Sequence, residues 1–520
     1  MDGVHFLAYK TDKGWITLII VTLSIFTIVI DKTFMNVAIS SLIRDLHTTI
    51  GTVQIIIATY SLTMASLMLV GGRIQNILGR KRTFLTGAVI YGVGTVVAAL
   101  SINSNMLLLG WSIMEGVGAA LMMPATTSII SGTYEGEKRA FALGITSSMA
   151  SGAGTVGPII GGFLTTFYSW RYAFGLELLV IIVIIIFSGE ISVFPPDMRW
   201  SQLNIVGAVN SAVGIFLFVL GILILNNPNN WYLAFILIVL GILLMIIFYL
   251  NQRSRISKNQ IPLVDISLFK DRGFSLANIT RFIMNFTIGG VLFIIPVYVQ
   301  SDLGANPLTT GLTLIPMSVA IFVMSSMAGK LSKQIQSRYI LAIGSLAAIT
   351  GSVYLTLIFN PYTTIIDMVP GIFLLGVGMG IVFPHSANEI FFAAKKEQQP
   401  DASGIMNTGI NLGSSLGTAI LGLILILGGF SSVGLVANTG QSMGIQDNIL
   451  GVNELVGKFE NNNQSYAAEK NMPVSIQKVN TMKTAFNLIT IVLLFSMIIS
   501  LFIPRHKTKK EAEGCVSSNI

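Results

Sequence analysis

The sequence contains a single cysteine, Cys515, and only four histidines among its 520 residues. A lone cysteine excludes disulfides within the chain, cysteine zinc sites and iron–sulfur clusters. The metalloprotease pattern HExxH and the phosphate-binding pattern GxxxxGK[ST] are also absent. We therefore expect no metal site, no cofactor and no enzymatic activity, and we do not expect ATP-driven pumping by this chain alone.

Charge is the second scarce feature. Only 10% of the residues are charged and 53% are hydrophobic, with a mean hydropathy of +0.76, whereas a soluble domain carries about 25% charged residues. These values exclude a disordered protein, a secreted disulfide scaffold and an ordinary cytosolic enzyme. The chain lacks the polar residues to cover a globule, so we expect an integral membrane protein.

Fourteen apolar stretches are long enough to cross a bilayer, which takes ~20 residues per helix. None shows the alternating pattern of ~10-residue barrel strands, so we predict an all-α membrane protein. The N-terminal segment lacks a signal-peptide cleavage pattern, and the first stretch is expected to stay as a helix. The expected spans are 15–38, 51–71, 83–101, 106–127, 140–165, 170–189, 203–225, 231–250, 274–300, 308–329, 338–358, 365–385, 402–430 and 482–503.

The distribution of lysine and arginine predicts the orientation. With the N-terminus inside, 23 of the 31 basic residues fall in cytoplasmic segments and 6 fall outside. This asymmetry indicates a multi-pass protein of the cell membrane with both termini in the cytoplasm. The net charge of +8 is then an orientation signal, and we expect no nucleic-acid partner.

Two parts of the chain resemble each other. The end of the second span (71–82) matches that of the tenth (328–339), and glycines of the fifth and thirteenth spans repeat at nearly the same separation. This pattern predicts two six-helix bundles. The expected organisation is an N-terminal arm 1–14, a first bundle 15–189, two inserted helices within 190–250, a linker 251–273, a second bundle 274–503 with an external loop 431–480, and a tail 504–520.

The connection between the second and third spans reads GRIQNILGRKR, from residue 72 to residue 82. Glycines permit a tight turn and close helix ends, and basic side chains can hold an inside gate. The segment resembles the signature loop of the major facilitator superfamily, although Asn76 replaces the usual aspartate. The matching residues, expected to form the gating loop, are Gly72, Gly79, Arg80, Lys81 and Arg82.

The fifth span contains a second motif, GAGTVGPIIGG. Small residues let neighbouring membrane helices approach closely, and proline permits a kink. The segment is similar to the antiporter motif of the same superfamily, which that family associates with exporters. The matching residues are Gly152, Gly157, Pro158, Gly161 and Gly162.

The first span ends in DKTFMNVA, residues 31–38, which resembles a motif of the 14-helix drug:proton antiporters, the branch with the quaternary-ammonium-compound and tetracycline exporters. This resemblance implies two rocking six-helix bundles that export lipophilic or cationic drugs in exchange for protons. The chain departs from the family pattern at Ser112 in place of arginine, at Glu115 in place of glutamine and at Glu177 in place of asparagine. Asn204 also stands at a position that is commonly acidic.

Ionisable residues inside a membrane cost about 3 kcal/mol each and need a reason. Our candidates for proton coupling or substrate binding are Asp31, Glu115, Glu177 and Arg281. Because the first and fourth helices line the central cavity in this superfamily, Asp31 and Glu115 are expected to be better placed than Glu177. Alternatively, Asp31 and Lys32 form a helix-end pair at the headgroups, and Glu115 bonds a neighbouring helix.

The sequence thus predicts a monomeric exporter whose partners are an amphipathic small molecule, protons and membrane lipids. Two alternatives stay open. One is an exporter of an endogenous lipid, peptide or metabolite, and the other is a non-transporting membrane sensor or scaffold, or a membrane enzyme.

Overall fold

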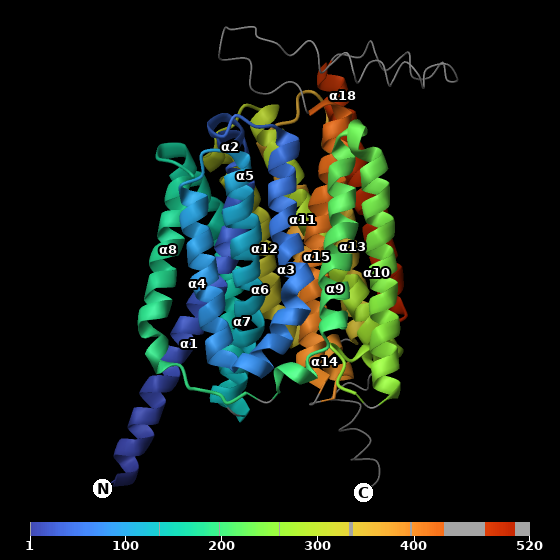
Figure 1. Cartoon of the computed structure of the whole chain (residues 1–520). Helices are drawn as coiled ribbons and strands as arrows, with labels where there is room; N and C mark the ends of the chain where they lie inside the picture. Colours follow the sequence, from blue (N-terminus) through green and yellow to red (C-terminus); the bar gives the residue numbers. More distant parts are fainter. Residues whose placement is uncertain are drawn as a thin grey trace, which may run out of the picture.

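A computed structural model describes residues 2–134, 136–196, 198–258, 260–331, 336–395, 398–430 and 474–504. Within these ranges the chain forms helices and no strand, which confirms the predicted all-α class. The long helices run alongside one another as one bundle (Figure 1). Most of the expected loop 431–480 and of the tail 504–520 lies outside the described residues, and 474–480 already belongs to the last helix.

Thirteen helices of the described part are long and apolar enough to cross a membrane, and the remaining expected span, 140–165, lies within a further helix, α7. The first six-helix group contains α1 (Asp2–Phe34), α3 (Ile50–Leu78), α4 (Arg80–Ala99), a composite fourth span, α7 (Gly136–Phe167) and α8 (Arg171–Ile186). Two further helices follow, α9 (Ile205–Leu223) and α10 (Trp231–Ser257). The last group contains α11 (Arg272–Ser301), α12 (Pro307–Leu331), α13 (Ser337–Ile358), α14 (Ile365–Ala393), α15 (Gln399–Leu425) and α18 (Val474–Leu501).

Side-chain caps explain where several helices begin. The Thr49 hydroxyl accepts a hydrogen bond from the Thr52 amide at the start of α3 (3.2 Å). The Asp271 carboxylate accepts one from the Phe274 amide at the start of α11 (2.8 Å). Each cap satisfies an amide that has no partner within the helix.

The composite fourth span is built of α5 (Ser104–Leu107), a π-helical segment η2 (Leu108–Glu115) and α6 (Gly116–Thr133). Two glycines let α4 lie directly against η2, because a Cβ on Gly94 or on Gly110 would stand 2.6 Å from a backbone atom of the other segment. Short π segments are rare and are found frequently at functional sites. The irregular backbone carries Trp111 and Glu115, which are buried.

The two six-helix groups meet along two pairs of helices, α3 with α15 and α7 with α12. The inserted pair α9 and α10 packs on the outside, with α9 against α3 and α15, and α10 forms the edge of the bundle (Figure 1). The cluster described below lies among the helices of the first group.

Candidate functional site

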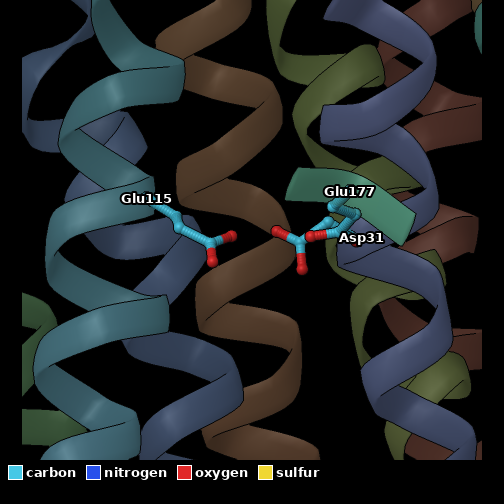
Figure 2. Close-up of side chains that lie close together, drawn as sticks. All are labelled: Asp31, Glu115 and Glu177. Atoms are coloured by element: carbon cyan, nitrogen blue, oxygen red, sulfur yellow. The ribbon is translucent and has the colours of Figure 1, made fainter. Parts of the chain in front are cut away.

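Three carboxylates from three different helices meet inside the first group. Asp31 comes from α1, Glu115 from the end of η2 and Glu177 from α8 (Figure 2). One oxygen of each lies within 4.8 Å of an oxygen of the others. Their exposed fractions are 0%, 0% and 4%. We call these residues the carboxylate cluster.

Aromatic side chains surround the cluster. The Trp111 indole N–H donates a hydrogen bond of 2.6 Å to Asp31 Oδ1, and the Trp111 ring stacks on Tyr60 at 4.9 Å. The hydroxyls of Tyr60 and Tyr91 are close enough to interact with Asp31, although neither reaches hydrogen-bond geometry with it. The Trp111 ring and its partner Tyr60 therefore fix the position of the Asp31 carboxylate.

The protein supplies the cluster with few hydrogen-bond donors and with no ion-pair partner among the described residues. Five of the six carboxylate oxygens of the cluster have no hydrogen-bond donor among the described residues: Asp31 Oδ2 and both oxygens of Glu115 and of Glu177. No described basic residue forms an ion pair with the three. The family's arginine position on the fourth helix is Ser112, whose hydroxyl donates instead to the Ile56 carbonyl (2.7 Å).

Lys32 does not neutralise its neighbour Asp31. Its ammonium group donates to Asn411 Oδ1 of α15 in the other group, at 3.4 Å. Adjacent helical residues point about 100° apart, so Asp31 faces into the first group while Lys32 faces the second. The alternative of an Asp31–Lys32 pair at the helix end is therefore not what the structure shows.

The cluster has the spacing of a site for a bound cation as well as for shared protons. Hard divalent cations take six or more oxygen ligands, and Mg²⁺ retains several waters. Besides the carboxylates, the described surroundings place two tyrosine hydroxyls nearby. The three carboxylates and the two hydroxyls together carry eight oxygens, which is enough for such an ion, whereas shared protons need no further ligands.

Arg281 lies apart from this cluster, between α11 and α14. Its guanidinium donates to the Phe383 carbonyl and to the Ser386 hydroxyl (3.2 Å) and lies 5.5 Å from the Phe383 ring centre. The structure therefore brings together three of the four predicted candidates.

The glycines of GAGTVGPIIGG let α7 contact two helices closely. A Cβ on Gly157 would collide with the Thr33 side chain, and one on Gly161 with Phe34. On another face, a Cβ on Gly162 would stand 2.6 Å from the Pro307 carbonyl of α12. The segment thus joins α12 of the second group to the turn of α1 that carries Asp31. Gly152 differs, since nothing lies within 4 Å of its Cβ position.

The basic loop ties the first group to the segment that follows α8. Gly79 has a φ of +87°, which favours glycine. Arg80 donates to the Ser128 carbonyl (2.8 Å) and lies over the Phe194 ring, and Lys81 donates to the Ile191 carbonyl (2.9 Å). Arg82 is exposed, and nothing lies within 4 Å of the Gly72 Cβ position. These contacts hold the first group together rather than joining the two groups.

The connection between the two groups at this end comes from residues that the sequence did not single out. Arg73 forms an ion pair with Asp401 of α15 (3.0 Å) and donates to the Leu263 carbonyl (2.6 Å). The Asp265 amide donates to the same Asp401 carboxylate (2.9 Å). The sequence offered one signal for this contact. It was a carboxylate in the first turn of a helix that follows a basic stretch. We call Arg73, Asp401, Leu263 and Asp265 the linker latch.

The family model described as Major Facilitator Superfamily matches residues 21–189 and 191–418. The chain belongs to the Major Facilitator Superfamily. This confirms the resemblance drawn from the loop and antiporter motifs.

Curated relatives within this superfamily are similar over most of their length. The methylenomycin A resistance protein of Bacillus subtilis (strain 168) is 26% identical, over 80% of this chain and 89% of the relative. The methyl viologen resistance protein SmvA of Salmonella typhimurium is 28% identical, over 79% and 83%. The multidrug efflux pump LfrA of Mycolicibacterium smegmatis is 25% identical, over 82% and 83%.

Solved structures support the fold. A crystal structure of the peptide transporter POT superposes with a TM-score of 0.64, covering 94% of each chain at 14% identity. At this identity the similarity shows a shared architecture and says nothing about the substrate. The superfamily membership indicates a transporter rather than an enzyme.

Proposed function

We propose that this protein is a secondary exporter of lipophilic or cationic small molecules, driven by protons that enter through the carboxylate cluster. The names of the curated relatives, which are resistance proteins and efflux pumps, support the direction and class of substrate. The bias of basic residues toward one side supports a cell-membrane location with both termini in the cytoplasm. The single observation that carries the proton coupling is the carboxylate cluster itself.

Electrostatics favours protons at this cluster. Like charges a few ångströms apart in a medium of low dielectric repel strongly, so closely spaced carboxylates share protons instead of ionising together. Since no described cation pairs with them, neutralisation requires a proton or a bound cation. A cluster that must gain and lose protons as its surroundings change is suited to coupling.

The antiporter motif connects the cluster mechanically to the interface between the two groups. Gly157 and Gly161 fit α7 against the Asp31 turn of α1, and Gly162 fits α7 against α12. When the two groups rock, α7 moves relative to α12, and the α1 turn that it touches is displaced with it. Water then reaches the cluster from one side of the membrane at a time, and protons are taken up outside and released inside.

The test uses everted membrane vesicles or proteoliposomes with an acidic interior and ethidium as the probe. Ethidium accumulation that collapses on addition of a protonophore supports the proposal. Equal accumulation in the presence of a strong chelator is expected, because the cluster carries protons and not a divalent metal. If no amphiphile moves in response to the gradient, drug:proton antiport is wrong; chelator-sensitive transport would instead assign the cluster to a metal.

A further inference from the structure

A cavity of about 370 Å³ lies between the inserted helix pair and both six-helix groups. Its walls come from α3, α9, α10, α11, α15 and the connection 264–269, with Leu69, Ile215, Met245, Phe282 and Ile405 among them. The volume falls in the range of small-molecule sites, ~300–1,000 Å³. We call this space the hairpin cavity.

The hairpin cavity is apolar and opens to the outside of the bundle. Its lining side chains are mainly aliphatic and aromatic. Two of them, Phe269 and Ile279, are 49% and 40% exposed, and α10 has little of its surface buried in the protein. In a bilayer, the neighbours at such an opening are the hydrocarbon chains of lipids.

Basic residues lie at the end of the cavity where α10 ends and α11 begins. Arg255 follows the lining residue Phe248 by about two helical turns, and Lys270 directly follows the lining residue Phe269. The five basic residues of this segment are Arg253, Arg255, Lys258, Lys270 and Arg272. None of them forms an ion pair with another described residue. Basic pockets between membrane helices attract anionic headgroups.

We propose that the hairpin cavity binds an acyl chain of an anionic phospholipid, whose headgroup lies against the basic residues of segment 253–272. The apolar walls account for the acyl chain, and the adjacent positive charge favours an anionic headgroup over a cationic drug. Because the walls come from both six-helix groups, the lipid fits one arrangement of the two groups better than another. Its occupancy therefore biases the rocking of the protein, beyond the proposed exchange of drug for protons.

Gly409 offers a means of filling the cavity. It belongs to the lining, and nothing lies within 4 Å of its Cβ position, so a larger side chain enters the space without a backbone collision. Gly175 of α8 also has nothing within 4 Å and is exposed away from the cavity. Gly409→Leu is therefore the filling variant, and Gly175→Leu is its matched control.

The experiment uses the full chain in nanodiscs with phosphatidylglycerol or phosphatidylcholine that carries the same photoreactive acyl chain. Cross-links are mapped to peptides by mass spectrometry. We expect phosphatidylglycerol to label residues 275–282 and 405–412 at least about fivefold more than phosphatidylcholine does. Gly409→Leu should remove this labelling, and Gly175→Leu should retain it.

A second variant tests the headgroup without altering the packed helices. Replacing Arg255, Lys258 and Lys270 by glutamine should abolish the preference for phosphatidylglycerol, whereas replacing Lys138 and Arg139 by glutamine should leave it intact. Equal labelling by the two lipids in the native protein would overturn the anionic assignment. Absence of labelling inside the cavity would overturn the site, and displacement of the label by ethidium would show that the cavity holds a transported drug instead. Gradient-driven transport is measured separately, so failure of this proposal is distinguishable from failure of the proposed function.

Discussion

At the scale of single residues, the main finding is the place of Glu177. The family resemblance favoured Asp31 and Glu115 over Glu177, yet the structure groups all three carboxylates. The reason is the packing of α8 on α1, where the rings of Phe174 and Phe34 meet edge to face at 5.3 Å. Glu177 lies one turn after Phe174, so this packing places it in the interior of the first group with the other two carboxylates.

The three carboxylates should each be required for coupling. Asp31→Asn, Glu115→Gln and Glu177→Gln each remove one proton-binding group, and we expect each to lower gradient-driven ethidium transport by about tenfold or more, a change of about 1.4 kcal/mol. Transport is measured in everted vesicles at matched expression.

Asp45 offers a matched control for these variants. It also accepts an indole N–H, from Trp170 at 3.0 Å, but it pairs with Arg171 and lies outside the cluster. Asp45→Asn should retain coupled transport. Wild-type coupling in all three cluster variants would remove the cluster as the proton carrier.

Lys32 should influence which substrates are carried. Its ammonium faces Asn411 across the interface between the groups, where positive charge repels cations. We expect Lys32→Gln to raise the ratio of ethidium transport to transport of an anionic fluorescent lipophile severalfold. Lys32→Arg, which keeps the charge, should leave the ratio unchanged. An unchanged ratio in Lys32→Gln would place Lys32 outside the substrate path.

At the scale of elements, the linker latch joins α3, the connection after α10 and α15. Burial raises the pKa of Asp265, but hydrogen bonds from Ser267 and Gln398 and the charge of Arg73 outweigh it, so the pKa lies below its usual value of 3.8. A carboxyl with a lowered pKa stabilises the folded protein fully above its unfolded pKa and loses this contribution as the pH falls through its folded pKa. The Asp265 contribution to the latch therefore persists in mildly acidic medium.

Breaking the latch should open the end of the bundle that carries the basic loops. Arg73→Gln and Asp401→Asn each remove the ion pair, and we expect each to increase maleimide labelling of Gly404→Cys in a Cys515→Ser background. Because both variants break the same ion pair, the double variant should add little to either single variant, with a coupling energy of about 0.5–3 kcal/mol. Additive effects of the two substitutions would show that they act independently.

The α7 glycines should differ sharply in how well they tolerate substitution by alanine. Gly157→Ala forces a Cβ against Thr33, and overpacking of this kind costs about 1–3 kcal/mol. We expect lower thermal stability in detergent and reduced transport. Gly152→Ala, with no atom within 4 Å of the added carbon, is the control and should resemble the native protein. Equal stability of the two variants would contradict the close packing of α7 on α1.

At the scale of the whole molecule, contacts also join the two groups at the end opposite the latch. The Ser40 amide donates to Gln300 Oε1 (2.9 Å), and the Gln300 amide group donates to the Val37 carbonyl (2.8 Å). Deeper in the interface, Gln54 of α3 donates to the Ala419 carbonyl of α15 (2.7 Å). A transport cycle by rocking requires the contacts at each end to separate in turn.

Linking that end covalently should stop transport. The single native cysteine makes a clean background, so Ser40→Cys and Gln300→Cys can be combined with Cys515→Ser and joined by a short, reducible bifunctional maleimide reagent. We expect the cross-linked protein to lose transport almost completely and to regain it after reduction. Either single-cysteine variant treated alike is the control, and continued transport by the cross-linked protein would exclude rocking of the two groups.

Much of the fold follows from local patterns that the sequence displays directly. The length of each apolar stretch predicts a membrane span, because a helix satisfies its own backbone hydrogen-bonding groups inside lipid. Glycine spacing predicted close contacts of α7, and the structure has them at Gly157, Gly161 and Gly162 but not at Gly152. The π-helical geometry of residues 108–115 was not predictable, because a π segment leaves the apolar length of the span unchanged.

The candidate site, like the fold, was predicted from the sequence only in part. That Asp31, Glu115 and Glu177 are rare charges in apolar helices is a property of the sequence alone, and so is the cost of placing them in lipid. Which of them meet, and that Lys32 faces away from Asp31 while Arg73 reaches Asp401, was decided only by the tertiary structure. The physical reason is that helix rotation and crossing are set by packing between segments distant in sequence, whereas hydrophobicity acts residue by residue.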